Sequence, residues 1–355
     1  MISPDLSASR SVLIPGRNNF DLLRFCFAMV VFLVHAYLLS GSTQLSWLSE
    51  VLSSAVAVKS FFVVSGFLIF MSYENSRGLR NYFEKRVRRI YPAYFTIVTL
   101  CTLLGSLLSV HTLRDYFSAP GLYQYLTVNL VFLNFVHSDL PGVFADNTLH
   151  AVNGALWTLK IEALFYLSVP LLAWLFRCIG RWQGLALVYI ASYIYVYVMG
   201  EFAQRSGGEF YLELQRQMPG QMMYFMAGAA LFYYYTQFAA HRKILLISAL
   251  GGILLAKGWD VGIVEPAALG VLVVYAACVF PYLGNFGKFG DFSYGIYIVH
   301  FPILQTLIAF GIFQVNPWAG LELAAALVMI AAFMMWHLVE KHFLRKSSHY
   351  VAVNR

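Results

Sequence analysis

The chain alternates between long apolar runs and short polar connections. A helix needs about 20 mostly apolar residues to cross a bilayer, and ten runs approach or reach that length. We predict spans at 20–40, 55–72, 91–111, 156–176, 184–200, 219–236, 243–257, 266–281, 293–313 and 317–338. An eleventh stretch, 122–136, is short and contains Gln124 and Asn129, so we expect it to lie flat on, or dip into, the outer face.

The composition is typical of a membrane protein. Of the 355 residues, 60% are hydrophobic and 12% are charged, whereas soluble domains are about 25% charged. The chain must therefore use lipid as part of its solvent. We predict an all-α polytopic membrane protein with an N-terminal tail at 1–17, a transmembrane domain at 18–340 and a C-terminal tail at 341–355.

The distribution of basic residues predicts the orientation of the spans. Lys and Arg concentrate in cytoplasmic loops. With the N-terminus in the cytoplasm and ten spans, 17 of the 24 Lys and Arg lie in cytoplasmic segments and 4 in outer loops. Both termini are then cytoplasmic, and the net charge of +7 reflects this bias, not nucleic-acid binding. The four cysteines form no CxxC pair, so we expect neither a zinc site nor a disulfide framework.

Two ionisable residues occupy the first predicted span, RFCFAMVVFLVH (24–35). An ionisable side chain inside a span costs about 2.5–3.5 kcal/mol and indicates a functional role. Arg24 and His35 are about three helical turns apart, so they face the same way at a distance of roughly 16 Å along the helix. Two structural alternatives stay open. Arg24 could be a snorkelling anchor at the start of the span, and His35 could make a structural hydrogen bond between helices.

Glu162 lies about six residues inside its span, in GALWTLKIEALFYL. Counted from the outer ends of their spans, Glu162 and His35 have similar depths. We therefore predict that they meet, because a carboxylate bonded to one imidazole nitrogen makes the other nitrogen a better base. The alternative is that Glu162 pairs with Lys160 or Arg114 at the interface.

A basic cluster precedes the third span. Six basic residues fall within 77–89, and Arg86 and Arg89 share one helical face. Guanidinium groups in this arrangement suit phosphate. The alternative is ordinary enrichment of basic residues on the cytoplasmic side.

Two further positions are weaker candidates. Ser65 and Gly66 are small residues in FFVVSGFLI (61–69), which favours close helix packing over a nucleophilic serine, because no GxSxG motif surrounds Ser65. His300, in FGDFSYGIYIVHFPI (289–303), lies about 10 Å from the cytoplasmic face by residue count. We therefore place it at the depth of Arg24, not of His35.

Four segments in this order resemble one family: FDLLRFCFAMVVFLVH (20–35), FFVVSGFLI with KRVRRIYPAYF (85–95), NGALWTLKIEALFYL (153–167) and FGDFSYGIYIVHFPI. The chain resembles membrane-bound acyltransferase family 3, which includes bacterial polysaccharide O-acetyltransferases. The resemblance implies ten spans in a bacterial inner membrane and acetyl-CoA as a cytoplasmic donor. It also implies, as acceptor, a sugar hydroxyl of a surface glycan: lipopolysaccharide O-antigen, capsule or exopolysaccharide.

The resemblance also assigns roles to residues. The family's Arg-x10-His motif falls on Arg24 and His35, and its Arg-x-x-Arg motif, associated with the donor, falls on Arg86 and Arg89. Lys160 departs from the common WSLSVE segment, which reads WTLKIE here. The predicted site comprises catalytic His35, Glu162 and Arg24, donor-binding Arg86, Arg89 and Arg88, and pocket residues Ser65, Trp157, Tyr166 and His300. We expect no metal and no tightly bound cofactor, since acyl-CoA is a substrate.

Several alternatives stay open at this point. The acceptor could instead be a lipid-linked sugar precursor or a small molecule, and the group could be a longer acyl chain. A ten-span transporter or flippase with a proton relay is the main rival from another functional class. We expect a stand-alone family member without an extra hydrolase-like domain, acting alone, as a homo-oligomer or with a separate partner.

Overall fold

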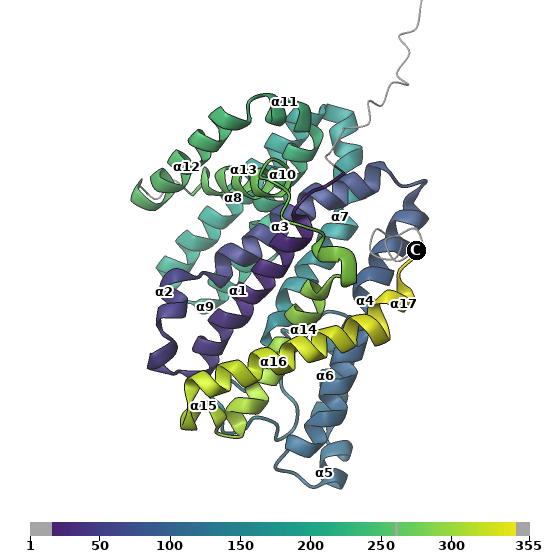
Figure 1. Ribbon diagram of the computed structural model, residues 1–355, viewed down its shortest axis with the longest axis vertical. Helices are drawn as coiled ribbons and strands as arrows, with labels where there is room; N and C mark the ends of the chain where they lie inside the picture. Colours follow the sequence, from purple (N-terminus) through teal and green to yellow (C-terminus); the bar gives the residue numbers. More distant parts are fainter. Residues whose placement is uncertain (1–15, 260–261, 346–355) are drawn as a thin grey trace, which may run out of the picture. The chain divides into compact units, whose positions relative to one another are not determined.

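All regular secondary structure in the described residues is helical (Figure 1). The structure is a computed structural model that describes residues 16–259 and 262–345, so the predicted tails lie largely outside the described residues. The predicted all-α class is confirmed. Within the described residues, seven helices are long and apolar enough to cross a membrane: α1 (Phe20–Ser40), α3 (Ser54–Glu74), α4 (Leu79–Leu108), α7 (Trp157–Ile179), α8 (Arg181–Ser206), α14 (Phe292–Ala309) and α16 (Pro317–Met335).

The three other predicted spans also form helices, but these are not among the seven. They correspond to α10 (Met218–Tyr233), α12 (Arg242–Trp259) and α13 (Glu265–Cys278), of 16, 18 and 14 residues. A span of standard tilt needs about 20 residues. The count of ten spans and the cytoplasmic position of both termini therefore stay predictions.

The described residues fall into two compact units. The first contains 16–20, 62–71 and 173–283, and the second contains 21–61, 72–172 and 284–345. Shorter elements complete them: η1 (Thr43–Leu45), α2 (Trp47–Val51), α5 (Leu113–Ser118), α6 (Pro120–Leu130), η2 (Gly154–Leu156), α9 (Glu209–Arg216), α11 (Tyr235–Ala240), η3 (Phe286–Phe289), α15 (Ile312–Val315), a π-helical turn (Trp336–Glu340) and α17 (Lys341–Phe343). Helices α3 and α7 contribute residues to both units.

In the first unit, α3 and α10 cross at two glycines. A Cβ atom added to Gly66 would lie 2.0 Å from the backbone oxygen of Phe225, and one added to Gly228 would lie 2.0 Å from that of Val63. Without side chains at these positions, the two backbones approach closely, as helices in membranes do at small residues. The packing role predicted for the Ser65–Gly66 pair is therefore confirmed for Gly66.

In the second unit, the stretch 122–136 packs against α4 through α6, and its position relative to the outer face stays a prediction. The hydroxyl of Tyr116, in α5, donates to the Thr102 carbonyl of α4 at 2.7 Å. Nearer the start of α4, the Tyr94 hydroxyl donates to the carbonyl of Asn129, near the end of α6, at 2.7 Å. Helix α6 thus runs antiparallel to α4 (Figure 1). The Asn129 amide donates to the carbonyl of His137 at 2.8 Å, so this backbone carbonyl of the segment after α6 has a hydrogen-bond donor.

Candidate active site

His35 of α1 and His300 of α14 form a bonded pair in the second unit. Nδ1 of His35 lies 2.9 Å from Nε2 of His300, and the rings stack with centroids 5.2 Å apart at 23°. His300 is fully buried, whereas His35 is half-buried. The prediction that His300 lies at the depth of Arg24 is wrong. It counted residues from helix ends, which fails because spans tilt and start at different levels.

Aromatic side chains enclose the pair. The Phe32 and Tyr297 rings meet His300 edge-on, at centroid distances of 6.5 and 5.9 Å. The Phe301 ring meets His35 in the same manner at 5.7 Å. These contacts limit the orientations open to both imidazoles, and His35 is the member that keeps accessible surface.

A proline and an asparagine position the helix that carries His300. Pro302 lies inside α14 and has no N–H, so the carbonyl of Ile298 loses its helical partner. The side chain of Asn153 donates to that carbonyl at 2.8 Å. A Cβ atom on Gly154 would come within 2.7 Å of the Phe301 ring, so glycine permits this close approach. The start of the NGALW segment is therefore a clamp on α14.

Glu162 bonds to Tyr166 and not to His35. Its carboxylate accepts from the Tyr166 hydroxyl at 2.5 Å, and the Arg86 guanidinium lies over the Tyr166 ring at 5.7 Å. The predicted contact between Glu162 and His35 is wrong: among the described residues, the Glu162 carboxylate bonds to Tyr166, and His35 bonds to His300. The positive charges that act on Glu162 are those of Arg89, Arg86 and Arg24.

The same region contains a second proline clamp. Pro170 removes the helical partner of the Tyr166 carbonyl, and the Tyr82 hydroxyl donates to that carbonyl at 3.0 Å. Tyr82 is fully buried. Helix α4 thereby holds the segment of α7 that carries Glu162 and Tyr166.

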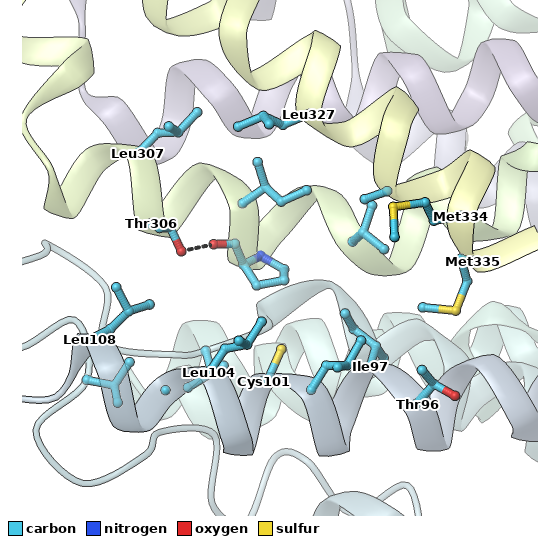
Figure 2. Close-up of a pocket in the computed structure, with 18 of the residues that line it drawn as sticks. Thr96, Ile97, Cys101, Leu104, Leu108, Thr306, Leu307, Leu327, Met334 and Met335 are labelled. Atoms are coloured by element: carbon cyan, nitrogen blue, oxygen red, sulfur yellow. Dashed lines mark hydrogen bonds between the residues drawn. The ribbon is translucent and has the colours of Figure 1, made fainter. Parts of the chain in front are cut away.

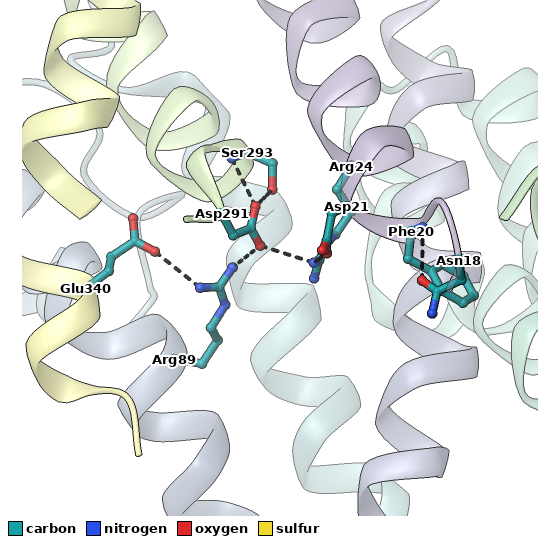
Figure 3. Close-up of polar contacts among 8 residues, drawn as sticks. All are labelled: Asn18, Phe20, Asp21, Arg24, Arg89, Asp291, Ser293 and Glu340. Atoms are coloured by element: carbon teal, nitrogen blue, oxygen red, sulfur yellow. Dashed lines mark hydrogen bonds and ion pairs between the residues drawn. The ribbon is translucent and has the colours of Figure 1, made fainter. Parts of the chain in front are cut away.

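A buried ionic chain joins α1, α4, the start of α14 and the π-helical turn (Figure 3). Arg89 bonds to Asp291 and lies 3.3 Å from Glu340, and Arg24 lies 3.2 Å from Asp291 and pairs with Asp21. Two guanidinium groups thus meet three carboxyl groups. Arg24 and Arg89 are neutralised from within the protein, in a position where an unpaired charge would be costly.

Asp291 is the central member of this chain. It caps the N-terminus of α14 by accepting from the backbone N–H of Ser293 at 3.1 Å. Burial alone would raise the pKa of the Asp291 carboxyl, but Arg24, Arg89 and the hydrogen bonds from Ser293 outweigh it and hold the pKa below its ordinary value. Asp291 is therefore ionised at neutral pH.

The remaining arginines of the basic cluster differ from Arg89. Arg86 donates to the Ser72 hydroxyl at 3.1 Å, and within the described residues it makes no ion pair and its buried Nε has no hydrogen-bond partner. Arg88 is 46% exposed and pairs with Glu84 at 2.9 Å. Of the three, Arg86 is thus the one whose close partners are neutral.

The comparisons with known proteins show the family of the chain. Residues 17–337, most of the chain, match the family described as the acyltransferase domain, acyltransferase family 3. The chain belongs to this family. It is 29% identical over 360 residues to Nodulation protein 10 of Rhizobium leguminosarum bv. viciae, covering 95% of each chain. It is 27% identical over 337 residues to an O-acetyl transferase of Shigella phage Sf6, covering 93% of this chain and 97% of that one.

These similarities cover nearly whole chains, so the protein is a membrane acyltransferase. No solved structure matches it. The helices that are long and apolar enough to span a bilayer carry these residues of the predicted site: Arg24, His35, Arg86, Arg89, Trp157, Glu162 and His300.

The other predicted site residues of the acyltransferase belong to α3 and α7. Trp157 begins α7 and is half-buried. Lys160, the departure from the family segment, has its ammonium group 4.0 Å from the centroid of the Phe135 ring. Ser65 belongs to the first unit, next to the Gly66 crossing.

Sequence reasoning missed Asp291, Glu340, Asn153 and Tyr82. Asp291 and Glu340 could have been identified from the sequence, because a carboxylate at the end of an apolar span is costly without a cationic partner. Asn153 and Tyr82 could not, since their partners are backbone carbonyls freed by prolines far away in the sequence.

The acyltransferase also has an apolar cavity of about 370 Å³ between α4, α14 and α16 (Figure 2). Cys101, Leu104, Pro302 and Met335 are among its lining residues. The Thr306 hydroxyl, which also lines the cavity, already donates its hydrogen bond to the Pro302 carbonyl at 2.7 Å. The cavity offers hydrocarbon contacts and no charge to a ligand.

Proposed function

We propose that this acyltransferase moves an acetyl or short acyl group from cytoplasmic acyl-CoA to a sugar hydroxyl of a bacterial surface glycan, working in the inner membrane. The observation that carries the proposal is the partly exposed His35, bonded to a fully buried His300 within helices that are long and apolar enough to span a membrane. A base is what a hydroxyl needs to attack a thioester. The relative named O-acetyl transferase supports an oxygen acceptor.

The reaction needs one base and conserves all atoms. Nε2 of His35 takes the proton of the sugar hydroxyl, and the sugar oxygen attacks the thioester carbonyl. The new C–O bond forms as the C–S bond breaks, and the proton then passes to the CoA thiolate. In a two-step version, Nε2 attacks the thioester carbonyl and CoA leaves as the thiolate. The sugar oxygen then takes the acyl group from Nε2, and the hydroxyl proton passes through the freed imidazole to the CoA thiolate.

The donor's phosphates fit Arg86 better than its neighbours. Arg24 and Arg89 are bonded to Asp291, and Arg88 to Glu84. Arg86 has only neutral close partners and a buried, unbonded Nε, so a phosphate there would gain a charge-assisted hydrogen bond. Arg24 and Arg89 would support the site by holding α1, α4 and α14 together, and Glu162 with Tyr166 would place Arg86.

The decisive experiment measures O-acetylation of a surface glycan. Wild type, His35→Ala and Glu162→Gln are expressed at equal membrane levels in a host without O-acetylation, and the glycan is analysed by proton NMR before and after mild alkali. His241→Ala is the matched control, because His241 is an exposed histidine bonded to the Gln237 carbonyl. We expect alkali-labile acetyl signals with wild type and His241→Ala only.

Two results would contradict the proposal. Signals that persist in His35→Ala would remove His35 as the base. Purified wild-type protein that releases no CoA from acetyl-CoA with any glycan or lipid-linked sugar offered would overturn the choice of donor. A signal on a lipid-linked precursor, and none on finished glycan, would move the acceptor to that precursor.

A further inference from the structure

The proton positions on the two histidines follow from one backbone carbonyl. Nδ1 of His300 lies 3.1 Å from the carbonyl oxygen of Ile296. A carbonyl only accepts, so Nδ1 of His300 carries the proton. The other nitrogen of a neutral imidazole is then an acceptor. At 2.9 Å, Nε2 of His300 must therefore accept from Nδ1–H of His35, which leaves the lone pair of His35 on Nε2.

The surroundings of His300 hold it neutral and in place. It has 0% exposure and contacts the rings of Phe32, Tyr297 and Phe301. A charged imidazolium without an ionic partner would be costly there. Rotation of the ring would break the bond to Ile296 and the bond to His35 together. The clamp of Asn153 on the Ile298 carbonyl holds the same stretch of α14.

We propose that His300 is a positioning residue that holds His35 in the Nδ1–H tautomer, so that Nε2 is the base in the transfer reaction. The inference rests on the proposed function of His35. When Nε2 takes the substrate proton, Nδ1–H of His35 keeps its bond to His300, and no proton moves between the rings. His300 therefore acts through His35 and touches neither donor nor acceptor.

A neutral orienting group suits this position. A carboxylate in the same place would hold the tautomer and also stabilise the imidazolium, but it would be a buried charge in the resting enzyme inside a membrane. The imidazole of His300 keeps the resting pair uncharged. The sequence predicted that Glu162 orients His35. The structure assigns this role to His300.

The first test reads the tautomer without using activity. Protein labelled with ¹⁵N-histidine is studied in lipid bilayers by solid-state NMR, which separates protonated from unprotonated ring nitrogens. Comparison with His35→Ala and His300→Gln assigns the signals of the pair. We expect a protonated Nδ1 and an unprotonated Nε2 on His35. A His35 that carries its proton on Nε2 would overturn the inference.

The second test uses two amides of different reach. His300→Gln keeps an acceptor near the position of Nε2, and His300→Asn places its amide near Nδ1 and leaves His35 without an acceptor. We expect kcat to fall by about 10²–10⁴-fold in His300→Asn and by less than about tenfold in His300→Gln. The KM for acyl-CoA should change by less than about twofold in both, since His300 does not touch the donor. Equal losses of kcat in the two variants would overturn the inference.

The two tests separate the possible failures. If His35→Ala stays active while NMR finds the expected tautomer, the function assigned to His35 fails and the proton arrangement stands. If His35→Ala is inactive while NMR finds the opposite tautomer, the function stands and the role of His300 fails. The NMR result on wild type needs no variant kinetics. The inference can therefore be tested even if His300→Asn is too unstable to assay.

Discussion

Asn153 supplies the hydrogen bond that Pro302 removes from helix α14. The proline leaves the carbonyl of Ile298 without its helical donor, and the Asn153 amide fills that place at 2.8 Å. The two residues are 149 positions apart in the sequence. The kink-forming proline and the loop that precedes α7 are thus parts of one device that positions His300.

The clamp predicts a specific coupling between the two positions. Asn153→Ala leaves a buried carbonyl unbonded, so we expect a loss of about 1–3 kcal/mol of stability. In Pro302→Ala the backbone N–H returns, so the same Asn153→Ala change should cost clearly less. Thermal unfolding of the four proteins of this double-mutant cycle, in one detergent, measures the difference. Equal costs in both backgrounds would contradict the clamp.

The ionic chain predicts opposite behaviour for two neighbouring arginines. Arg89→Ala removes the arginine that pairs with Glu340 and one of the two arginines that pair with Asp291, both carboxyl side chains being 2% exposed, and should cost about 3–5 kcal/mol. Arg88→Ala breaks an exposed pair with Glu84 and should cost less than about 1 kcal/mol. Thermal unfolding compares them. Similar losses for both would mean that the buried chain contributes nothing beyond a surface pair.

The depressed pKa of Asp291 predicts an acid-sensitive contribution to stability. Its unfolded-state pKa is about 3.9, and the folded-state pKa is lower. The contribution is therefore complete above about pH 4 and is lost as the pH falls through the folded-state pKa. The difference in unfolding temperature between wild type and Asp291→Asn, measured from pH 7 to 3, should begin to shrink as the pH falls below about 4. A constant difference across this range would contradict the assignment.

Arg86 predicts the affinity for the donor. Removing a charge-assisted bond costs about 1.5–3 kcal/mol, so Arg86→Ala should raise the KM for acyl-CoA by about 10–150-fold. Arg88→Ala should leave that KM within about twofold, because its guanidinium is exposed and paired with Glu84. Steady-state kinetics with purified protein measures both. An unchanged KM in Arg86→Ala would place the phosphates elsewhere.

The glycine crossing of the first unit predicts a steric effect. In Gly66→Ala the new methyl group would lie 2.0 Å from a backbone oxygen of α10, so the helices must separate, at a cost of about 1–3 kcal/mol. Gly251→Ala is the control, because a Cβ atom there has no neighbour within 4 Å and lies inside α12. It should stabilise the protein by about 0.5–1 kcal/mol. Unfolding temperatures that fall equally in both would argue against the close crossing.

The sequence by itself determined the class of the protein and the residues of interest. Apolar runs of about 20 residues require helices in a membrane, because backbone polar groups must bond internally there. Charged and titratable residues inside such runs are costly, so Arg24, His35, Glu162 and His300 stood out without any structure. The number of apolar runs and the bias of basic residues predicted the orientation of the spans in the membrane. The small residues Ser65 and Gly66 predicted a site of close helix packing.

Only the tertiary structure decided which of these residues meet. Depth counted from span ends placed His35 with Glu162 and His300 with Arg24, whereas the structure bonds His35 to His300 and Glu162 to Tyr166. The reason is physical: helices tilt and start at different levels, and a buried arginine pairs with whichever carboxylate the packing brings near. Arg89 with Asp291, and Asn153 with the carbonyl freed by Pro302, depend on packing between distant segments that no local pattern encodes.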